Sequence, residues 1–278
     1  MSRALATLVT ALADDELVLG HRHSEWTGYA PHIEEDVAFS SIAQDEVGHA
    51  AALYALAGKI LGDEPDHLAF GRQADEYRNA LLCERPNGDW AYTLARHWVY
   101  DTADDVRLES MEGSSNEELA ALTTKMRREE RYHLIHAEMW LKRIARGPIE
   151  GRNKLIHALE EVLLDSSGLF EPLPEEDTAL TEGWVTASSQ ELAARFLART
   201  NAWLDEVGIP IGPHSIAGER AEFVASSSGD LIEEAGPSLD EAHTSKGGGG
   251  RSGRHSPDFT ELWDVMTKTY REHPGARW

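Results

Sequence analysis

Two Glu-x-x-His pairs, each interrupting an apolar helical stripe, constrain this chain more than any other feature. Glu46 and His49 lie in "AQDEVGHAA", and Glu130 and His133 lie in "REERYHLIH". Side chains three residues apart share one face of a helix. Because burying an isolated charge is very costly, ionisable groups in the middle of such a stripe must be paired or metal-bound. The pattern therefore predicts interior partners for all four side chains.

A carboxylate precedes each pair at nearly the same distance along the chain. Glu16 lies 30 residues before Glu46, and Asp101 lies 29 residues before Glu130, each in the apolar stripe of a further predicted helix. This arrangement matches the four-helix di-metal carboxylate pattern, in which two helices supply a carboxylate and two supply Glu-x-x-His. The spacing favours a metal centre with six ligands: Glu16, Glu46, His49, Asp101, Glu130 and His133.

Other interpretations of single residues remain open. Each Glu-x-x-His pair alone is equally consistent with a buried hydrogen-bonded pair. Glu16 follows Asp14 and Asp15, which we expect to be solvated, so it too has a solvated alternative. Asp101 competes for its role with Asp104 and Asp105. Three histidines are expected to pack, to form hydrogen bonds or to lie outside the ligand set: His23, His97 and His136.

Four carboxylates and two imidazoles favour iron or manganese over zinc or copper. Two ferrous ions can supply two electrons to O₂. Hydrogen bonds to the ligands tune the redox potential of the ions. The chain contains no G-x-G-x-x-G motif after a strand, and its one cysteine, Cys83, cannot ligate an iron–sulfur cluster. Electrons must therefore come from another protein.

Long helical patterns dominate the 278 residues, and strand-like alternation is scarce. The sequence predicts an all-α fold, a ferritin-like four-helix bundle with additional helices and a loop-rich C-terminal region. The division that we predict is a helical domain over 1–207, a loop-rich, flexible segment over 208–255 that includes "GGGG", and a C-terminal helix within 256–278 that docks on the bundle or on a partner. Helices are expected over 2–24, 31–61, 65–82, 89–111, the segment from "GSSNEEL" to 144, 151–167 and 187–206.

The net charge of −23 argues against nucleic-acid binding and against docking on an anionic membrane. A single cysteine excludes an internal disulfide and is typical of a reducing cytoplasm. The N-terminal apolar run lacks a cleavage signature, so we interpret it as the start of a helix. No run of about 18 apolar residues is present, which argues against a membrane span.

Four passages resemble the phenylacetyl-CoA ring-epoxidising monooxygenases of the ferritin-like superfamily, and specifically their C-type subunits. These passages are "LVLGHRHSEWTGYAP", "LLCERPNGDWAYTLARHWVYD", "EERYHLIHAEMWLKRI" and the ending "GRSGRHSPDFTELWDVMTKTYREHPGARW". The resemblance implies related A-type and C-type helical subunits, a small bridging subunit and a separate flavin and iron–sulfur reductase. It also implies that the di-iron centre lies in the A-type subunit, which binds the CoA thioester.

In that family some of the metal ligands are commonly missing from the C-type subunit, whereas all six positions are filled here. Three hypotheses follow. The chain is a C-type subunit that retains a di-metal site, a purely structural scaffold of the same complex, or a stand-alone ferritin-like ferroxidase. The loop-rich region after Gly208 and the "PGARW" ending argue against the ferroxidase. The substrate, phenylacetyl-CoA, is implied by the resemblance alone.

Overall fold

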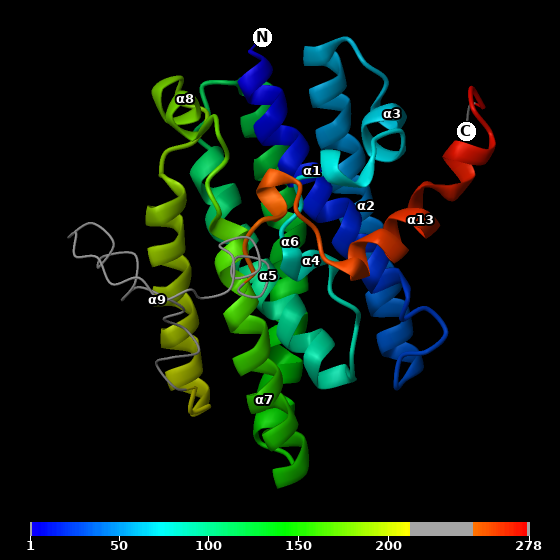
Figure 1. Ribbon diagram of the computed structural model, residues 1–278. Helices are drawn as coiled ribbons and strands as arrows, with labels where there is room; N and C mark the ends of the chain where they lie inside the picture. Colours follow the sequence, from blue (N-terminus) through cyan, green and yellow to red (C-terminus); the bar gives the residue numbers. More distant parts are fainter. Residues whose placement is uncertain (1, 212–246, 277–278) are drawn as a thin grey trace, which may run out of the picture.

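The computed structural model of the protein describes residues 2–211 and 247–276. These residues form helices and turns and contain no strand, which confirms the predicted all-α, ferritin-like architecture. Two helical pairs form the central bundle: α1 packs along α2, and α5 packs along α6 (Figure 1). α2 also contacts α6, while α7 and α9 pack against α5.

The bundle helices are α1 (Arg3–Ser24), α2 (Ile33–Leu61), α5 (Trp90–Met111) and α6 (Glu117–Ala145). They are followed by α7 (Ile149–Asp165) and α9 (Ser189–Val207). Shorter elements connect them: α3 (Pro65–Phe70), η1 (Ala74–Glu76), α4 (Leu81–Glu84), η2 (Ser166–Phe170) and α8 (Glu176–Thr181). The C-terminal part contains η3 (Gly250–Ser252) and α13 (Pro257–Glu272).

Local sequence signals explain several of the helix ends. The Asp89 side chain accepts a hydrogen bond from the amide of Tyr92 and caps α5. Pro257 occupies the first turn of α13, where its missing N–H costs nothing. The apolar face of α13, with Phe259 and Leu262 buried, packs against α3, α4 and η1.

The expected single helix over 65–82 is wrong, because the chain there divides into α3, η1 and α4. Two buried aspartates of α1 explain the break. Asp14 accepts a hydrogen bond from the amide of Arg78 at 2.7 Å, and Asp15 accepts one from the amide of Ala80 at 2.8 Å. Side-chain acceptors thus replace the carbonyls that a continuous helix would supply.

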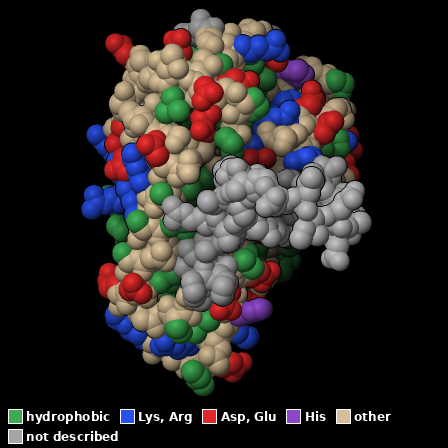
Figure 2. All heavy atoms as spheres, turned by 60° about the vertical axis from the view of Figure 1, so that its left-hand side comes forward, with side chains coloured by type: hydrophobic (Ala, Val, Ile, Leu, Met, Phe, Trp, Pro, Cys, Tyr) green, Lys and Arg blue, Asp and Glu red, His purple; other side chains and the backbone are tan. Residues whose placement is uncertain are grey.

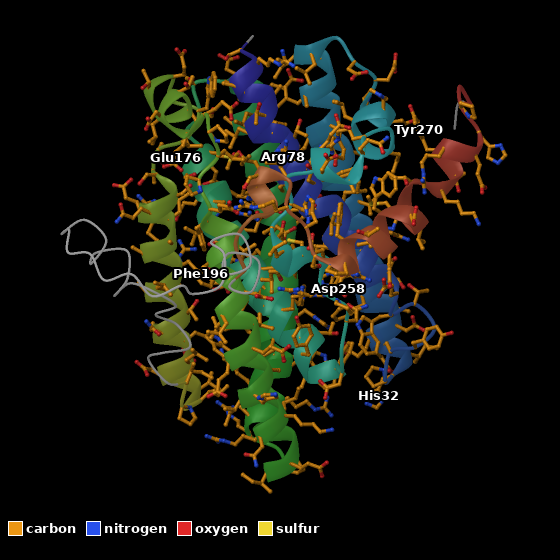
Figure 3. All side chains as sticks on the ribbon, viewed as in Figure 1. His32, Arg78, Glu176, Phe196, Asp258 and Tyr270 are labelled. Atoms are coloured by element: carbon orange, nitrogen blue, oxygen red, sulfur yellow. The ribbon has the colours of Figure 1, made fainter. Side chains whose placement is uncertain are left out.

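The expectation that Asp14 and Asp15 are solvated is also wrong, since both are fully buried. Asp15 accepts hydrogen bonds from Arg107 and from Arg251, at 2.6 and 2.7 Å. Burial alone would raise the pKa of Asp15, but these two guanidinium groups hold it below its ordinary value. Arg251 also donates to the backbone oxygen of Arg78. Figure 3 labels Arg78, which lies beside the C-terminal segment, residues 247–276.

The four glycines at 247–250 differ from the expected flexible linker. A Cβ atom on Gly250 would lie 2.1 Å from the backbone oxygen of Asn79, and one on Gly247 would lie 2.5 Å from that of Asp165. Glycine is required here because two backbones approach closely, and this approach brings Arg251 to Asp15. The rest of the predicted loop-rich segment, residues 212–246, lies outside the described residues.

None of the helices within residues 2–211 and 247–276 combines the length and apolar character that crossing a membrane requires. Figure 2 shows acidic, basic and apolar side chains interspersed over one face of the molecule. A cytoplasmic location and the absence of nucleic-acid binding stay predictions.

Replacing Arg251 tests whether this buried ion group holds the C-terminal segment to the bundle. Arg251→Ala leaves Asp15 buried with one cation fewer, so we expect the free energy of unfolding to fall by about 3 kcal/mol. Lys59→Ala, the control, removes an ion pair with Glu118 whose side chains are about half exposed, and should cost less than about 1 kcal/mol. Urea denaturation measures both, and equal losses would contradict the proposed anchoring.

Candidate metal centre

The six predicted ligands come from the four bundle helices, and all are buried. Glu16 lies on α1, Glu46 and His49 on α2, Asp101 on α5, and Glu130 and His133 on α6. None of these residues is more than 3% exposed. The stripes identified from the sequence therefore do face the interior.

Glu16, His49 and Glu130 are brought together most closely. One ligand-type atom from each lies within 4.8 Å of the other two. Nδ1 of His49 is 3.2 Å from Oε2 of Glu16 and 3.2 Å from Oε1 of Glu130. The second oxygen of Glu130 is 3.2 Å from Nδ1 of His133, so Glu130 lies between the two imidazoles.

Each Glu-x-x-His imidazole is held from outside by an acid of the other helix. Nε2 of His49 contacts Oε2 of Glu129 at 2.9 Å, and Nε2 of His133 contacts Oδ2 of Asp45 at 3.2 Å. Both rings therefore turn Nδ1 toward Glu130. Metal-ligating histidines typically use one nitrogen for the metal and donate the other N–H to such a carboxylate, which fixes the ring orientation.

The electrostatics of this group follow from burial and from these pairings. Burial opposes the charge on His49, but its contacts with Glu130 and Glu16 outweigh that and raise its pKa to about 12. Burial likewise opposes the charge on His133, whose contact with Glu130 raises its pKa to about 10. Burial would raise the pKa of Glu130, yet the two imidazoles hold it well below its ordinary value. In the protein without a metal, the imidazoles of His49 and His133 are therefore charged near pH 7.

Glu46 and Asp101 face different partners. Oε2 of Glu46 is 2.9 Å from Nδ1 of His23, and Oδ2 of Asp101 is 3.3 Å from Nδ1 of His97. Burial raises the pKa of both carboxyl groups well above the ordinary range. Burial also lowers the pKa of His23 and of His97 well below theirs, so both imidazoles are neutral near pH 7.

The donor set fits a metal on two observations. Several buried polar atoms have no hydrogen-bond partner among the described residues, and leaving such an atom unpaired costs about 1–3 kcal/mol. Carboxylate oxygens and imidazole nitrogens are also the ligands that iron and manganese accept in proteins. The atoms that also lack an ion-pair partner are Oε1 of Glu46, Oδ1 of Asp101, Nε2 of His23 and Nε2 of His97.

Two acids beside the centre, Asp45 and Glu129, were not predicted from the sequence. Each directly precedes the glutamate of a Glu-x-x-His pair, so an acid–Glu-x-x-His repeat is readable in both segments. Tyr100, whose hydroxyl donates to Oε1 of Glu16 at 2.7 Å, was not predicted either. No spacing signal links Tyr100 to Glu16, because 84 residues separate them.

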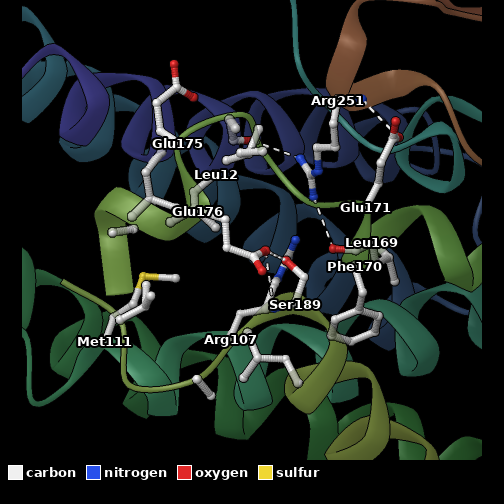
Figure 4. Close-up of a pocket in the computed structure, with 17 residues that line it drawn as sticks. Leu12, Arg107, Met111, Leu169, Phe170, Glu171, Glu175, Glu176, Ser189 and Arg251 are labelled. Carbon is white, nitrogen blue, oxygen red and sulfur yellow. Dashed lines mark hydrogen bonds between the residues drawn. The ribbon is translucent and has the colours of Figure 1, made fainter. Parts of the chain in front are cut away.

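A cavity of about 70 Å³ lies elsewhere, between α1, α5, η2, α8 and α9 (Figure 4). Its wall is mainly apolar and includes Leu12, Met111 and Phe170, together with Arg107 and Arg251. None of the six predicted ligands lines it.

Comparison with known proteins identifies the family. A family model described as "Phenylacetic acid catabolic protein" matches residues 1–222. The chain belongs to this family. It is also 31% identical over 238 residues to the C subunit of the 1,2-phenylacetyl-CoA epoxidase of Escherichia coli K12. That match covers 85% of this chain and 94% of the E. coli protein.

These findings confirm the resemblance to the phenylacetyl-CoA epoxidases and to their C-type subunits. The family match extends across α1, α2, α5 and α6, so it includes every residue of the candidate centre. Both Glu-x-x-His pairs and both upstream carboxylates lie in this region.

The raised pKa values predict how stability depends on pH in the metal-free family member. The charged forms of His49 and His133 stabilise the fold fully below their unfolded pKa of about 6.5, and this contribution is lost as pH rises toward the folded values. The free energy of unfolding in EDTA should therefore fall between pH 7 and pH 9. His49→Gln should make this slope shallower, by up to about 1.4 kcal/mol per pH unit.

Urea denaturation at pH 7, 8 and 9 measures the effect. His157→Gln is the control, because His157 is exposed on α7. An unchanged slope in His49→Gln would show that the His49 imidazole is not held charged between Glu16 and Glu130.

Proposed function

We propose that this chain is the C-type subunit of a multicomponent oxygenase that converts phenylacetyl-CoA to its ring 1,2-epoxide in aerobic phenylacetate catabolism. The observation that carries the proposal is the likeness to the C subunit of a phenylacetyl-CoA epoxidase over 94% of that protein's length. In the proposed complex this chain pairs with a related A-type catalytic subunit. A small bridging subunit and a separate flavin and iron–sulfur reductase complete the complex.

We also propose that the chain retains a di-iron carboxylate site. Glu16, His49 and Glu130 would hold one iron, and Asp101 and His133 the other, with Glu130 and Glu46 shared between them. The contacts of His49 and His133 with Glu130 support this assignment most directly. When bound, a pair of ferrous ions supplies electrons to O₂.

Other residues of the chain orient the ligands of such a site. Glu129 and Asp45 orient the two imidazoles, and Tyr100 holds one oxygen of Glu16. All six ligands are buried, and Glu130 also borders a surface pocket that Arg127 and Arg131 line. The same contacts support a second candidate, a scaffold role, because they already compensate the charges of His49 and Glu130 without a metal.

Metal analysis combined with turnover separates the two roles. We expect about two irons per chain after anaerobic reconstitution. Glu130→Gln, which removes the charge between the imidazoles, should reduce this to less than about 0.2. Glu138→Gln, a partly exposed acid on the same helix, should bind iron like the wild type. Less than about 0.2 iron or manganese per wild-type chain would overturn the metal site.

The oxygenase assignment is tested in the same preparation. The complex with the A-type subunit and reductase should add one oxygen atom to phenylacetyl-CoA, as measured by mass spectrometry, and omission of this chain should abolish product. A complex with the Glu130→Gln variant that lacks iron in this chain but keeps full turnover would establish the scaffold role. Full turnover without this chain would contradict both candidates.

An exposed apolar strip on α2 and α6 supports the proposed pairing with a related subunit. Tyr132, Ile135 and Met139 follow one face of α6, and each is more than half exposed. Ile33 and Val37 on α2 are also more than 60% exposed, and α2 contacts α6. Exposed apolar side chains that follow one another along one helix face, as Tyr132, Ile135 and Met139 do on α6, are typical of protein–protein contacts.

Substitution in this strip should weaken association with the A-type subunit. Ile135→Asp places a charge in the proposed contact, and we expect at least a tenfold higher Kd, or about 1.4 kcal/mol. Val265→Asp is the control, because Val265 is 73% exposed on α13, away from the strip. Isothermal titration calorimetry measures both. Equal affinities would place the partner elsewhere.

A further inference from the structure

A second group of buried donors adjoins the proposed di-iron ligands. One ligand-type atom from each of His23, Glu46 and His97 lies within 4.8 Å of the other two. The three residues come from α1, α2 and α5, and none is more than 1% exposed. Only Glu46 belongs to the six residues that the sequence pattern selects.

Packing holds these donors in place, but not all of their polar atoms form hydrogen bonds. The rings of His23 and His97 meet edge to face with centroids 5.1 Å apart, and Phe39 packs on both at 5.3 and 5.5 Å. A hydrogen bond joins Nδ1 of His23 to Oε2 of Glu46 at 2.9 Å. Nε2 of His23, Oε1 of Glu46 and Nε2 of His97 have no hydrogen-bond partner among residues 2–211 and 247–276, whereas Nδ1 of His97 lies 3.3 Å from Oδ2 of Asp101.

Simple core packing does not account for this arrangement. Buried polar side chains normally form hydrogen bonds, and a histidine that serves only as a packing residue is no exception. Here aromatic contacts on His97 fix the ring and Nδ1 lies 3.3 Å from Oδ2 of Asp101, while Nε2 has no hydrogen-bond partner among the described residues. Two imidazoles and one carboxylate that converge from three helices are a typical ligand set for a divalent transition metal.

We propose that His23, Glu46 and His97 bind a divalent transition-metal ion at a nitrogen-rich site that adjoins the proposed di-iron centre and shares Glu46 with it. The set supplies two nitrogens and one oxygen, which suits zinc, whereas Glu16, His49 and Glu130 supply one nitrogen and two oxygens. Bonds of about 2.1 Å require the donors to move closer by roughly an ångström on binding. The ion would join α1, α2 and α5. The proposal shares Glu46 with the proposed function and is otherwise independent of it.

Zinc binding to the metal-free full-length chain tests the site. The chain is incubated with Zn²⁺ alone, freed of excess by gel filtration and measured for zinc by mass spectrometry. His23→Gln and His97→Gln should each retain one zinc fewer per chain than the wild type. His136→Gln is the matched control: its ring lies 5.9 Å from that of His97, but His136 does not belong to the converging group of His23, Glu46 and His97, and this variant should bind zinc like the wild type.

Glu16→Gln keeps the two tests distinguishable, because it alters the proposed di-iron ligands and leaves His23 and His97 intact. This variant should still lose one zinc when His97→Gln is added. Unchanged zinc in both His23→Gln and His97→Gln would overturn the nitrogen-rich site and leave the proposed function standing. Unchanged metal content in Glu16→Gln itself would instead count against the di-iron ligand set.

A second measurement covers the case in which the histidine variants do not fold. Cu²⁺ is added to folded Glu16→Gln protein, and pulsed electron paramagnetic resonance counts the imidazoles on the bound ion. The expected result is two imidazole nitrogens on one copper. A copper signal with one imidazole or none would overturn the proposal.

Discussion

The buried contact between His49, Glu130 and His133 is the interaction on which the interior of this bundle depends. The Glu130 carboxylate lies between the imidazoles of His49 and His133. It therefore compensates the buried positive charges on both α2 and α6. The acids Glu129 and Asp45 complete the arrangement from outside, each bonding to the histidine of the opposite helix. This reciprocal pairing fixes how α2 and α6 face each other, and it turns both Nδ1 atoms toward the carboxylate that a metal would share.

Much of the centre could be predicted because the relevant signals are local. Glu-x-x-His spacing selects one helical face, and the apolar residues around it identify that face as buried. The start of α5 follows from the capping side chain of Asp89, and the start of α13 follows from Pro257 in its first turn. These signals predicted the all-α fold and the burial of both Glu-x-x-His pairs, whereas Glu16 also had a solvated alternative.

The remaining features depend on contacts between distant segments. The carboxyl group of Asp15 pairs with Arg251, which lies 236 residues further along the chain. No local sequence pattern predicts that pairing or the burial of Asp15. The same long-range packing requires glycine at Gly247 and Gly250, although four successive glycines are typical of a flexible linker. The contacts of Glu46 with His23 and of Asp101 with His97 could not be predicted either. Both histidines fit an apolar helical stripe equally well as packing residues.

Locating the metal itself tests the proposed di-iron site most directly. Crystals of the protein reconstituted with iron can be measured at the iron absorption edge, and an anomalous difference map then shows each iron position. We predict one peak within about 2.5 Å of Glu16, Glu130 and Nδ1 of His49, and a second beside Nδ1 of His133. A map without a peak among these residues, with both imidazoles still paired to their carboxylates, would contradict the proposed di-iron site and leave the scaffold role.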